Sequence, residues 1–175
     1  IIEGGHQIKG EIRVSGNKNA VLPMIAATLL TDEEIILENV PNILDVRSML
    51  EIADSVGIEI SHSRGGTLSL CCREIRNSTL KQELCSKLRT SILFAGPMLA
   101  RCGKISFWPP GGDFIGRRRL DAHFYGLKCL GAKIISEEPP YTLSAPHLTG
   151  RELFFDEASV TATEHILMTA TKAKG

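Results

Sequence analysis

A lysine stands at the turn between an expected strand and an expected helix. Lys18 and Asn19 lie in the motif GNKNA at residues 16–20, after the alternating segment 11–15 and before a helix with Pro23 in its first turn. A lysine at such a turn can meet an anion where free backbone N–H groups of the helix point outward. The alternative is a turn whose Asn and Gly residues serve the backbone geometry while the lysine is solvated.

A glycine-rich loop at residues 109–119 is the second place that could do chemistry. It holds three glycines, one acid, Asp113, and three consecutive arginines, Arg117 to Arg119. Arginine forks bind phosphate through paired hydrogen bonds, and a glycine loop can close over a ligand. The alternative is an ordinary surface loop whose charges are solvated.

Two further candidates lie on expected helices. Arg89 stands beside an apolar stripe, a position where an arginine is usually solvated. Thr161 and Glu164 have the T-x-x-E spacing of a helix capping box, which would account for both residues without any ligand.

An internal repeat supplies the elements that must position these residues. The segments 55–61 and 67–69 are similar to 129–135 and 142–144, with Gly57 and Gly131 about 75 residues apart. Each copy is typical of a helix end, a glycine stop, a short strand, a turn and a second strand.

Apolar spacing predicts the rest of each unit. Helical stripes cover 46–56, 84–99 and 120–127, and Pro97 is expected to kink or end the second of them. Short strands are expected at 35–37 and 105–108. The predicted unit is therefore helix, strand, helix, strand, strand, preceded by an entering strand. A third unit is expected to start at 151–155, with a helix from about Thr161, and to be cut short at Gly175.

Composition excludes several classes of protein. Lys plus Arg number 20, and Asp plus Glu also number 20. The formal net charge of zero argues against a polycationic protein that coats nucleic acid or an acidic membrane. The apolar run 20–30 is too short to cross a bilayer. The five cysteines form no C-x-x-C and the histidines are scattered, so we expect no metal site, no disulfide framework and a reducing cytoplasm.

Taken in order, the motifs resemble the family of UDP-N-acetylglucosamine enolpyruvyl transferases, also called 1-carboxyvinyltransferases. The resemblance covers the whole chain and rests on residues 16–20, 88–91, 110–112, 115–116 and 118, followed by Asp121 and His123. It implies an α/β (α+β) fold of two domains, each an inside-out α/β barrel of three repeated β-α-β-α-β-β units. It also implies that residues 1–17 pack with a second domain absent from this chain, and that 18–175 form part of the first domain.

The resemblance implies an addition–elimination reaction. The enolpyruvyl group of phosphoenolpyruvate passes to the 3-hydroxyl of UDP-N-acetylglucosamine and phosphate is released, as the first committed step of peptidoglycan synthesis, with no metal or organic cofactor. The chain alone is expected to be inactive, because the presumed general base and a further anion-binding arginine belong to the second domain. The implied phosphoenolpyruvate-binding residues are Lys18, Asn19 and Arg118. The implied UDP-sugar-binding residues are Arg89, Arg118, Arg119, Leu120, Asp121, Ala122, Glu157, Ser159 and Val160.

Three positions depart from the pattern of this family. Asp113 stands where most members have the cysteine that donates a proton and reacts with fosfomycin, although a minority carry Asp. Glu157 stands where a lysine is usual, and Thr161 where a glycine is usual.

Two alternative functions remain open from the sequence. The sister transferase acting on shikimate 3-phosphate usually has Asp-Lys-Ser where this chain has Asn-Lys-Asn at 17–19. An RNA-processing or RNA-binding module can be built from related repeats, although zero net charge and 5% aromatic residues weigh against it. Binding of UDP-N-acetylglucosamine, of shikimate 3-phosphate or of RNA would separate the three.

Overall fold

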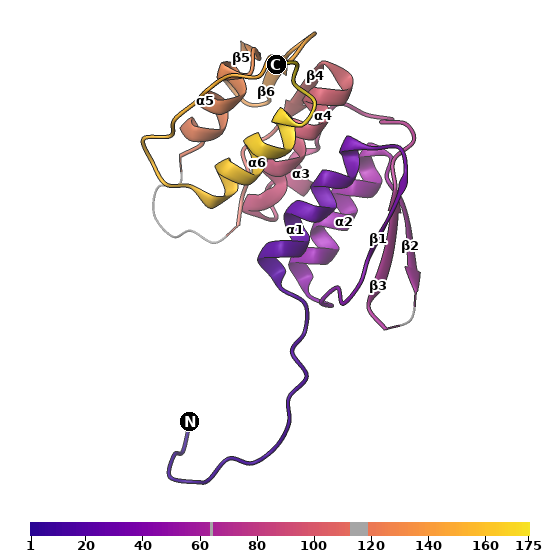
Figure 1. The fold of residues 1–175 in the computed structure, drawn as a ribbon, viewed down its shortest axis with the longest axis vertical. Coiled ribbons are helices and arrows are strands. Elements are labelled where there is room, and N and C mark those ends of the chain that lie inside the picture. The colour runs from indigo at the N-terminus through magenta and orange to yellow at the C-terminus, as the bar shows by residue number, and fades with distance from the viewer. Residues whose placement is uncertain (64, 113–118) are drawn as a thin grey trace.

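The computed structural model describes residues 1–63, 65–112 and 119–175, with the side chain of Ser63 left out. Two similar units follow one another along the chain, each with a three-stranded antiparallel sheet (Figure 1). The first unit contains α1 (Lys18–Ala27), the 3-10 helix η1 (Thr28–Leu30), β1 (Glu34–Leu37), α2 (Leu44–Val56), β2 (Glu59–Ser63) and β3 (Thr67–Cys71).

The second unit repeats this order with an irregular first helix. Its elements are α3 (Gln82–Cys85), the 3-10 helix η2 (Arg89–Phe94), α4 (Ala95–Cys102), β4 (Lys104–Phe107), α5 (Asp121–Cys129), β5 (Lys133–Ser136) and β6 (Tyr141–Ser144). The last helix, α6 (Val160–Ala170), opens the third unit and packs against α4 and α5.

The two sheets have the same topology, which confirms the repeat expected from the sequence. Their strand orders are β1-β3-β2 and β4-β6-β5, so the last strand of each unit is central. Leu70 pairs with Ile35 and Ile60, and Leu143 pairs in the same way with Ile105 and Ile134. The sheets lie outside the helices, and one buried apolar cluster joins both units (Figure 1).

The glycine stops follow from local backbone chemistry. Gly57 caps α2 with φ 110°, and Gly131, just after α5, has φ 98°. Both values lie in the left-handed region, which glycine enters without the steric penalty of a Cβ atom. The N–H of Gly57 bonds to Asp54 O and that of Gly131 to Lys128 O, closing the two helix ends. Both predicted helix stops are confirmed.

The entering strands differ from the prediction. The segment 78–80, which enters the second unit, pairs with Ser106 of β4. The N–H of Ser106 donates to Ser78 O, and the carbonyl of Ser106 accepts the N–H of Leu80, both at 2.9 Å. A similar parallel bridge joins Thr149 to Lys174, a little before the expected start at 151–155. The predicted strand at 11–15 is wrong for this chain, because residues 1–17 form no strand and extend away from the body (Figure 1). A strand needs a partner for its N–H and C=O groups, and the described residues provide none there.

The helix expected over the stripe 84–99 is broken into α3, η2 and α4, although its apolar face is buried as predicted. Pro97 does not end it: this proline is the third residue of α4. A proline is tolerated in the first turn of a helix because the N–H that it lacks has no intrahelical acceptor there. No helix of the described residues is long and apolar enough to span a membrane.

Candidate functional site

Lys18 is the first residue of α1, and Asn17 caps that helix. The Asn17 Oδ1 accepts the N–H groups of Asn19 at 2.7 Å and of Ala20 at 3.2 Å. Two of the N–H groups that the hypothesis from the sequence offered to an anion are therefore already satisfied by the cap, and the anion site at Lys18 stays a prediction. The ammonium of Lys18 instead forms an exposed ion pair with Asp45 of α2. Such a pair contributes about 1 kcal/mol or less, so an anionic ligand can compete for the lysine.

Arg89 is tied to the segment that leads into α5. Its Nη2 donates to the backbone carbonyl of Arg119 at 2.7 Å, across 30 residues of sequence. Arg119 in turn pairs through Nε with the Asp121 carboxylate at 2.5 Å, in the first turn of α5. The alternative of a merely solvated Arg89 is wrong, because this arginine holds the start of α5 against η2.

A hollow of about 700 Å³ opens beside this contact. Under it, Phe124 meets Tyr141 edge-on, with ring centroids 5.3 Å apart, and stacks on Phe107. These aromatic contacts hold α5 on the second sheet. The lining residues are Arg89, Pro109, Pro110, Arg119, Leu120, Asp121, Phe124, Tyr125, Lys128, Ile134, Glu137 and Tyr141.

A second hollow, of about 490 Å³, lies on the other side of the same turn. It shares Arg119, Asp121 and Tyr125 with the first hollow and reaches the segment before α6. Its lining residues are Arg119, Asp121, Ala122, Tyr125, Phe154, Asp156 and Glu157. Three carboxylates face one guanidinium in this lining, so its described charges favour hydroxyl donors over a diphosphate.

The structure brings together six of the predicted UDP-sugar residues around these two hollows. They are Arg89, Arg119, Leu120, Asp121, Ala122 and Glu157. Lys18 and Asn19 line neither hollow, and Asp113 and Arg118 lie outside the described residues. α1 and α6 nevertheless pack together and begin at the same end of the view, so the first turns of both helices face one side of the molecule (Figure 1).

The capping box predicted for Thr161 and Glu164 is wrong. α6 begins at Val160, and Ser159 is its N-cap, with Oγ accepting the N–H of Ala162 at 3.3 Å. Ser159 satisfies that helical N–H group, and Thr161 lies one residue inside the helix. Of the predicted UDP-sugar residues, Ser159 thus has a structural role of its own, and the side chain of Val160 is exposed.

Two buried histidines were missed as functional candidates. Nδ1 of His123 in α5 lies 3.0 Å from Nδ1 of His165 in α6, and Nε2 of His165 accepts the backbone N–H of Gly96 at 2.7 Å. Burial and the neighbouring Arg89 guanidinium lower the pKa of His123 to about 4. Burial, followed by His123, lowers the pKa of His165 well below its usual value. The sequence signal was present: each histidine lies on the apolar face of its helix.

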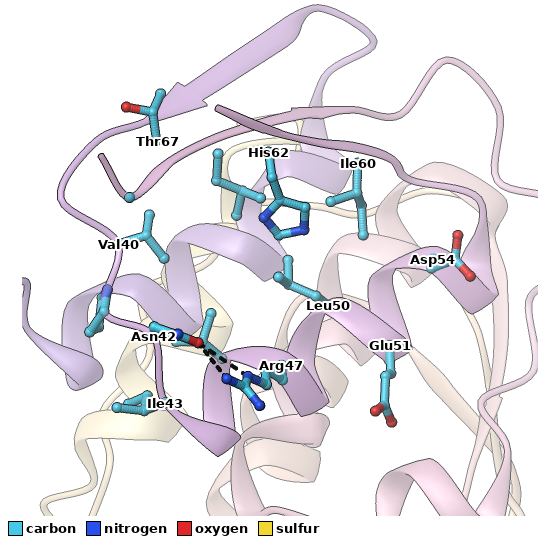
Figure 2. A pocket seen from close by; sticks show the side chains of 14 residues that line it. Val40, Asn42, Ile43, Arg47, Leu50, Glu51, Asp54, Ile60, His62 and Thr67 are labelled. Atoms are coloured by element: carbon cyan, nitrogen blue, oxygen red, sulfur yellow. Dashed lines mark hydrogen bonds between the residues drawn. The ribbon is translucent and has the colours of Figure 1, made fainter. Parts of the chain in front are cut away.

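A further hollow, of about 710 Å³, lies in the first unit between α2 and the first sheet (Figure 2). It occupies the position in the repeat that the site hollow has in the second unit, with Leu50 and Ile60 in place of Phe124 and Ile134. Arg47 donates to Asn42 Oδ1 at 2.8 and 3.1 Å, as Figure 2 shows. Because none of the predicted site residues lines it, the smaller hollows of the second unit are the candidate site.

Replacing Arg89 by lysine in the full-length protein is expected to weaken UDP-N-acetylglucosamine binding about tenfold, because the hydrogen bond from a charged donor to the Arg119 carbonyl contributes about 1.5 kcal/mol. Titration calorimetry measures this. Arg47→Lys, which alters an arginine lining the corresponding hollow of the first unit, is the control and should change nothing. Equal affinities for both variants would contradict the role given to Arg89.

Fold and site together define the class of protein. Residues 2–175 match the family described as EPSP synthase (3-phosphoshikimate 1-carboxyvinyltransferase), and the chain belongs to this family. The fold is that of an enolpyruvyl transferase. NikO from Streptomyces tendae superposes with a TM-score of 0.77 at 17% identity, covering 95% of this chain and 39% of that one. EPSP synthase from Acinetobacter baumannii gives a TM-score of 0.73 at 17% identity, with the same coverage.

Relatives within the class are more specific. The UDP-N-acetylglucosamine 1-carboxyvinyltransferase of Borreliella burgdorferi is 51% identical over 175 residues, which are 100% of this chain and 41% of that protein. The enzyme of the same name from Bradyrhizobium diazoefficiens is 49% identical over 175 residues, or 100% of this chain and 40% of that protein. The chain thus spans about two fifths of the length of these relatives. The resemblance described from the motifs is confirmed.

Proposed function

We propose that the full-length protein transfers the enolpyruvyl group of phosphoenolpyruvate to the 3-hydroxyl of UDP-N-acetylglucosamine in the cytoplasm. The observation that carries this is the identity of 51% across the whole chain with a relative of that name, against 17% to a solved EPSP synthase. The Asn-Lys-Asn sequence at 17–19 also favours the UDP-sugar enzyme over the shikimate 3-phosphate enzyme.

In this proposal, two positively charged side chains and one amide bind the phosphoenolpyruvate. Lys18, Asn19 and Arg118 would hold its phosphate and carboxylate, with the Lys18 ammonium exchanging Asp45 for the substrate. The sugar hydroxyl adds to C2 and gives its proton to a general base of the second domain, while C3 takes a proton from Asp113. C3 then returns a proton to the Asp113 carboxylate, the bond from C2 to the phosphate oxygen breaks, and phosphate leaves. Cations beside the phosphate stabilise the charge that it carries away.

The UDP-sugar would lie along the first turns of α5 and α6. Sugar hydroxyls can donate to the carboxylates of Asp156 and Glu157 in the second hollow, where the described charges are mostly negative. The diphosphate requires cations, and the arginines at 117 and 118 are the candidates that the sequence supplies next to Arg119. This division accounts for Glu157 at a position where the family usually has lysine.

The N-terminal segment fits a role outside this domain. Ile8, Ile12 and Val14 are almost fully exposed, which is uncommon for alternating apolar residues. We infer that residues 1–17 pack with a second domain in the full-length protein, and that 18–175 form part of the first domain. The active site would then lie between the two domains.

The purified chain 1–175 is therefore expected to show no enolpyruvyl transfer. A site that takes residues from two domains lacks essential groups when one domain is missing. Phosphate release with both substrates is the measurement, and the full-length protein is the positive control. Sustained turnover by the chain alone, free of full-length enzyme, would show that the site is complete without the second domain.

The proposed function itself is tested with the full-length protein. Phosphate should be released from phosphoenolpyruvate with UDP-N-acetylglucosamine and not with shikimate 3-phosphate, and mass spectrometry should detect the enolpyruvyl ether of the sugar nucleotide. Turnover with shikimate 3-phosphate would favour the sister transferase. RNA binding without either turnover would favour the third alternative.

A further inference from the structure

The buried histidines join the two helix starts that carry the candidate UDP-sugar residues. His123 lies in the first turn of α5, directly after the group 119–122. His165 lies in the second turn of α6, and the group 157–160 leads into the first residue of that helix. The contact between Nδ1 atoms at 3.0 Å therefore links the two halves of the candidate site. Gly96 extends the link to α4.

The donor of each hydrogen bond follows from the backbone. The N–H of Gly96 is a donor, so Nε2 of His165 must be an unprotonated acceptor, 2.7 Å away. A neutral His165 then has its proton on Nδ1, which donates to Nδ1 of His123. His123 in turn has its proton on Nε2. Only this placement of the protons gives the Gly96 N–H an acceptor and puts one donor and one acceptor between the two rings. An added proton on either ring would bring two N–H donors face to face.

Close helix packing determines where the rings lie. A Cβ atom on Gly96 would come within 2.7 Å of His165 Nε2, and one on Gly126 would overlap Ile166 of α6. Thr169 Oγ1 donates to the carbonyl of His165 at 2.7 Å. The helices α4, α5 and α6 thus approach closely, and the ring of His165 is packed directly against the backbone of α4.

The repeat indicates that packing alone does not require a histidine at this position. In the first unit, the residue that corresponds to His123 is Met49, an apolar side chain buried in the same core. A methionine fills such a site without polar atoms that need partners. Met49 accepts only a hydrogen bond at its sulfur, from Thr90 Oγ1 at 3.6 Å, whereas the imidazole pair provides shorter hydrogen bonds between helices.

Resting on the proposed function, we propose that His165 is a positioning residue for UDP-N-acetylglucosamine. Through His123 it sets the spacing between the starts of α5 and α6, and so the shape of the hollow between them. Among the described residues, Arg89 is a charged group that acts on His123, and its guanidinium already holds the Arg119 carbonyl at the same turn. The arrangement makes the sugar-nucleotide site sensitive to acid.

The direction of the pH effect follows from the lowered pKa values. The pKa of each histidine is lower in the folded protein than the ordinary value of 6.5. The unfolded chain thus binds protons first as the pH falls below about 6.5, and the stability from the pair is lost towards the pKa of about 4 of His123. Above about pH 6.5, the histidine pair makes its full contribution to the stability of the folded protein.

The test uses the full-length protein and the variants His165→Leu and His165→Gln. Leucine removes both hydrogen bonds, whereas one glutamine amide supplies an acceptor for Gly96 and a donor for His123. We expect the KM for UDP-N-acetylglucosamine to rise about tenfold in the leucine variant, with kcat and the KM for phosphoenolpyruvate little changed. The glutamine variant should retain the wild-type values, as should the control His62→Gln, an exposed histidine of β2.

Nitrogen-15 NMR of the histidine rings provides a measurement that does not depend on activity. In the wild type, His165 should show the Nδ1–H tautomer and His123 the Nε2–H tautomer, and both tautomers should persist at about pH 5.5. The opposite tautomers, or wild-type KM values in a folded leucine variant, would overturn the proposal. Wild-type protein that fails to bind the sugar nucleotide at all would instead refute the proposed function.

Discussion

Exchange of Asp113 for cysteine in the full-length protein is expected to allow covalent inactivation by fosfomycin, which the natural protein is expected to resist. A thiolate opens an epoxide much more readily than a carboxylate does, because it is the stronger nucleophile. Mass spectrometry of the full-length protein after treatment should show an adduct at residue 113 in the variant and none in the natural protein. An adduct on the natural protein, or none on an active cysteine variant, would show that this position is misassigned.

The same exchange should also change the pH dependence of transfer. A general acid must be protonated before the reaction, and an aspartic acid at its ordinary pKa of about 3.9 is protonated in about one molecule in a thousand at neutral pH. A cysteine at its ordinary pKa of about 8.5 is almost entirely protonated there. We expect the natural enzyme to have its optimum at lower pH than Asp113→Cys, as measured by kcat/KM for phosphoenolpyruvate from about pH 5 to about pH 9.

Replacement of Lys18 by alanine is expected to lower kcat/KM for phosphoenolpyruvate by about tenfold to a hundredfold, because a charge-assisted hydrogen bond to phosphate contributes about 1.5–3 kcal/mol. The fold should survive, since Lys18 is exposed and its ion pair with Asp45 contributes little. Steady-state kinetics and thermal unfolding of the full-length variant measure the two effects separately.

Asp45→Asn is the matched control for Lys18. It breaks the same ion pair but leaves the ammonium in place, so kcat/KM should not fall. Lys104→Ala, at an exposed lysine of β4, controls for the loss of a surface charge. If Lys18→Ala and Asp45→Asn have equal effects on both rate and stability, Lys18 only joins α1 to α2, and the phosphate-binding role is wrong.

Elements that depend on local chemistry follow from the sequence. The strands at 35–37 and 105–108 are present within one residue, as β1 and β4, and the glycines at 57 and 131 end their helices with positive φ. Apolar periodicity and the left-handed freedom of glycine operate within a single element. The repeat made the two sheets predictable as well, because equal patterns in two units fold in equal ways.

Helix caps and the entering strand required the tertiary structure. Asn17 satisfies two of the N–H groups at the start of α1, and Ser159 rather than Thr161 caps α6. Several residues near a helix start can supply the cap, and the path of the preceding chain selects one of them. The segment 11–15 alternates like a strand, yet a strand forms only where another element offers a free edge.

The sequence by itself determined the family and the repeat, and it predicted six of the residues that line the two site hollows. Only the tertiary structure decided that Arg89 holds the Arg119 carbonyl and that His123 meets His165. Each histidine alone is a polar residue on an apolar helical face, separated from the other by 42 positions. Spacing along the chain determines which face of a helix a side chain occupies. The distance between two helices depends instead on the volumes of all the side chains packed between them, here including Gly96 and Gly126.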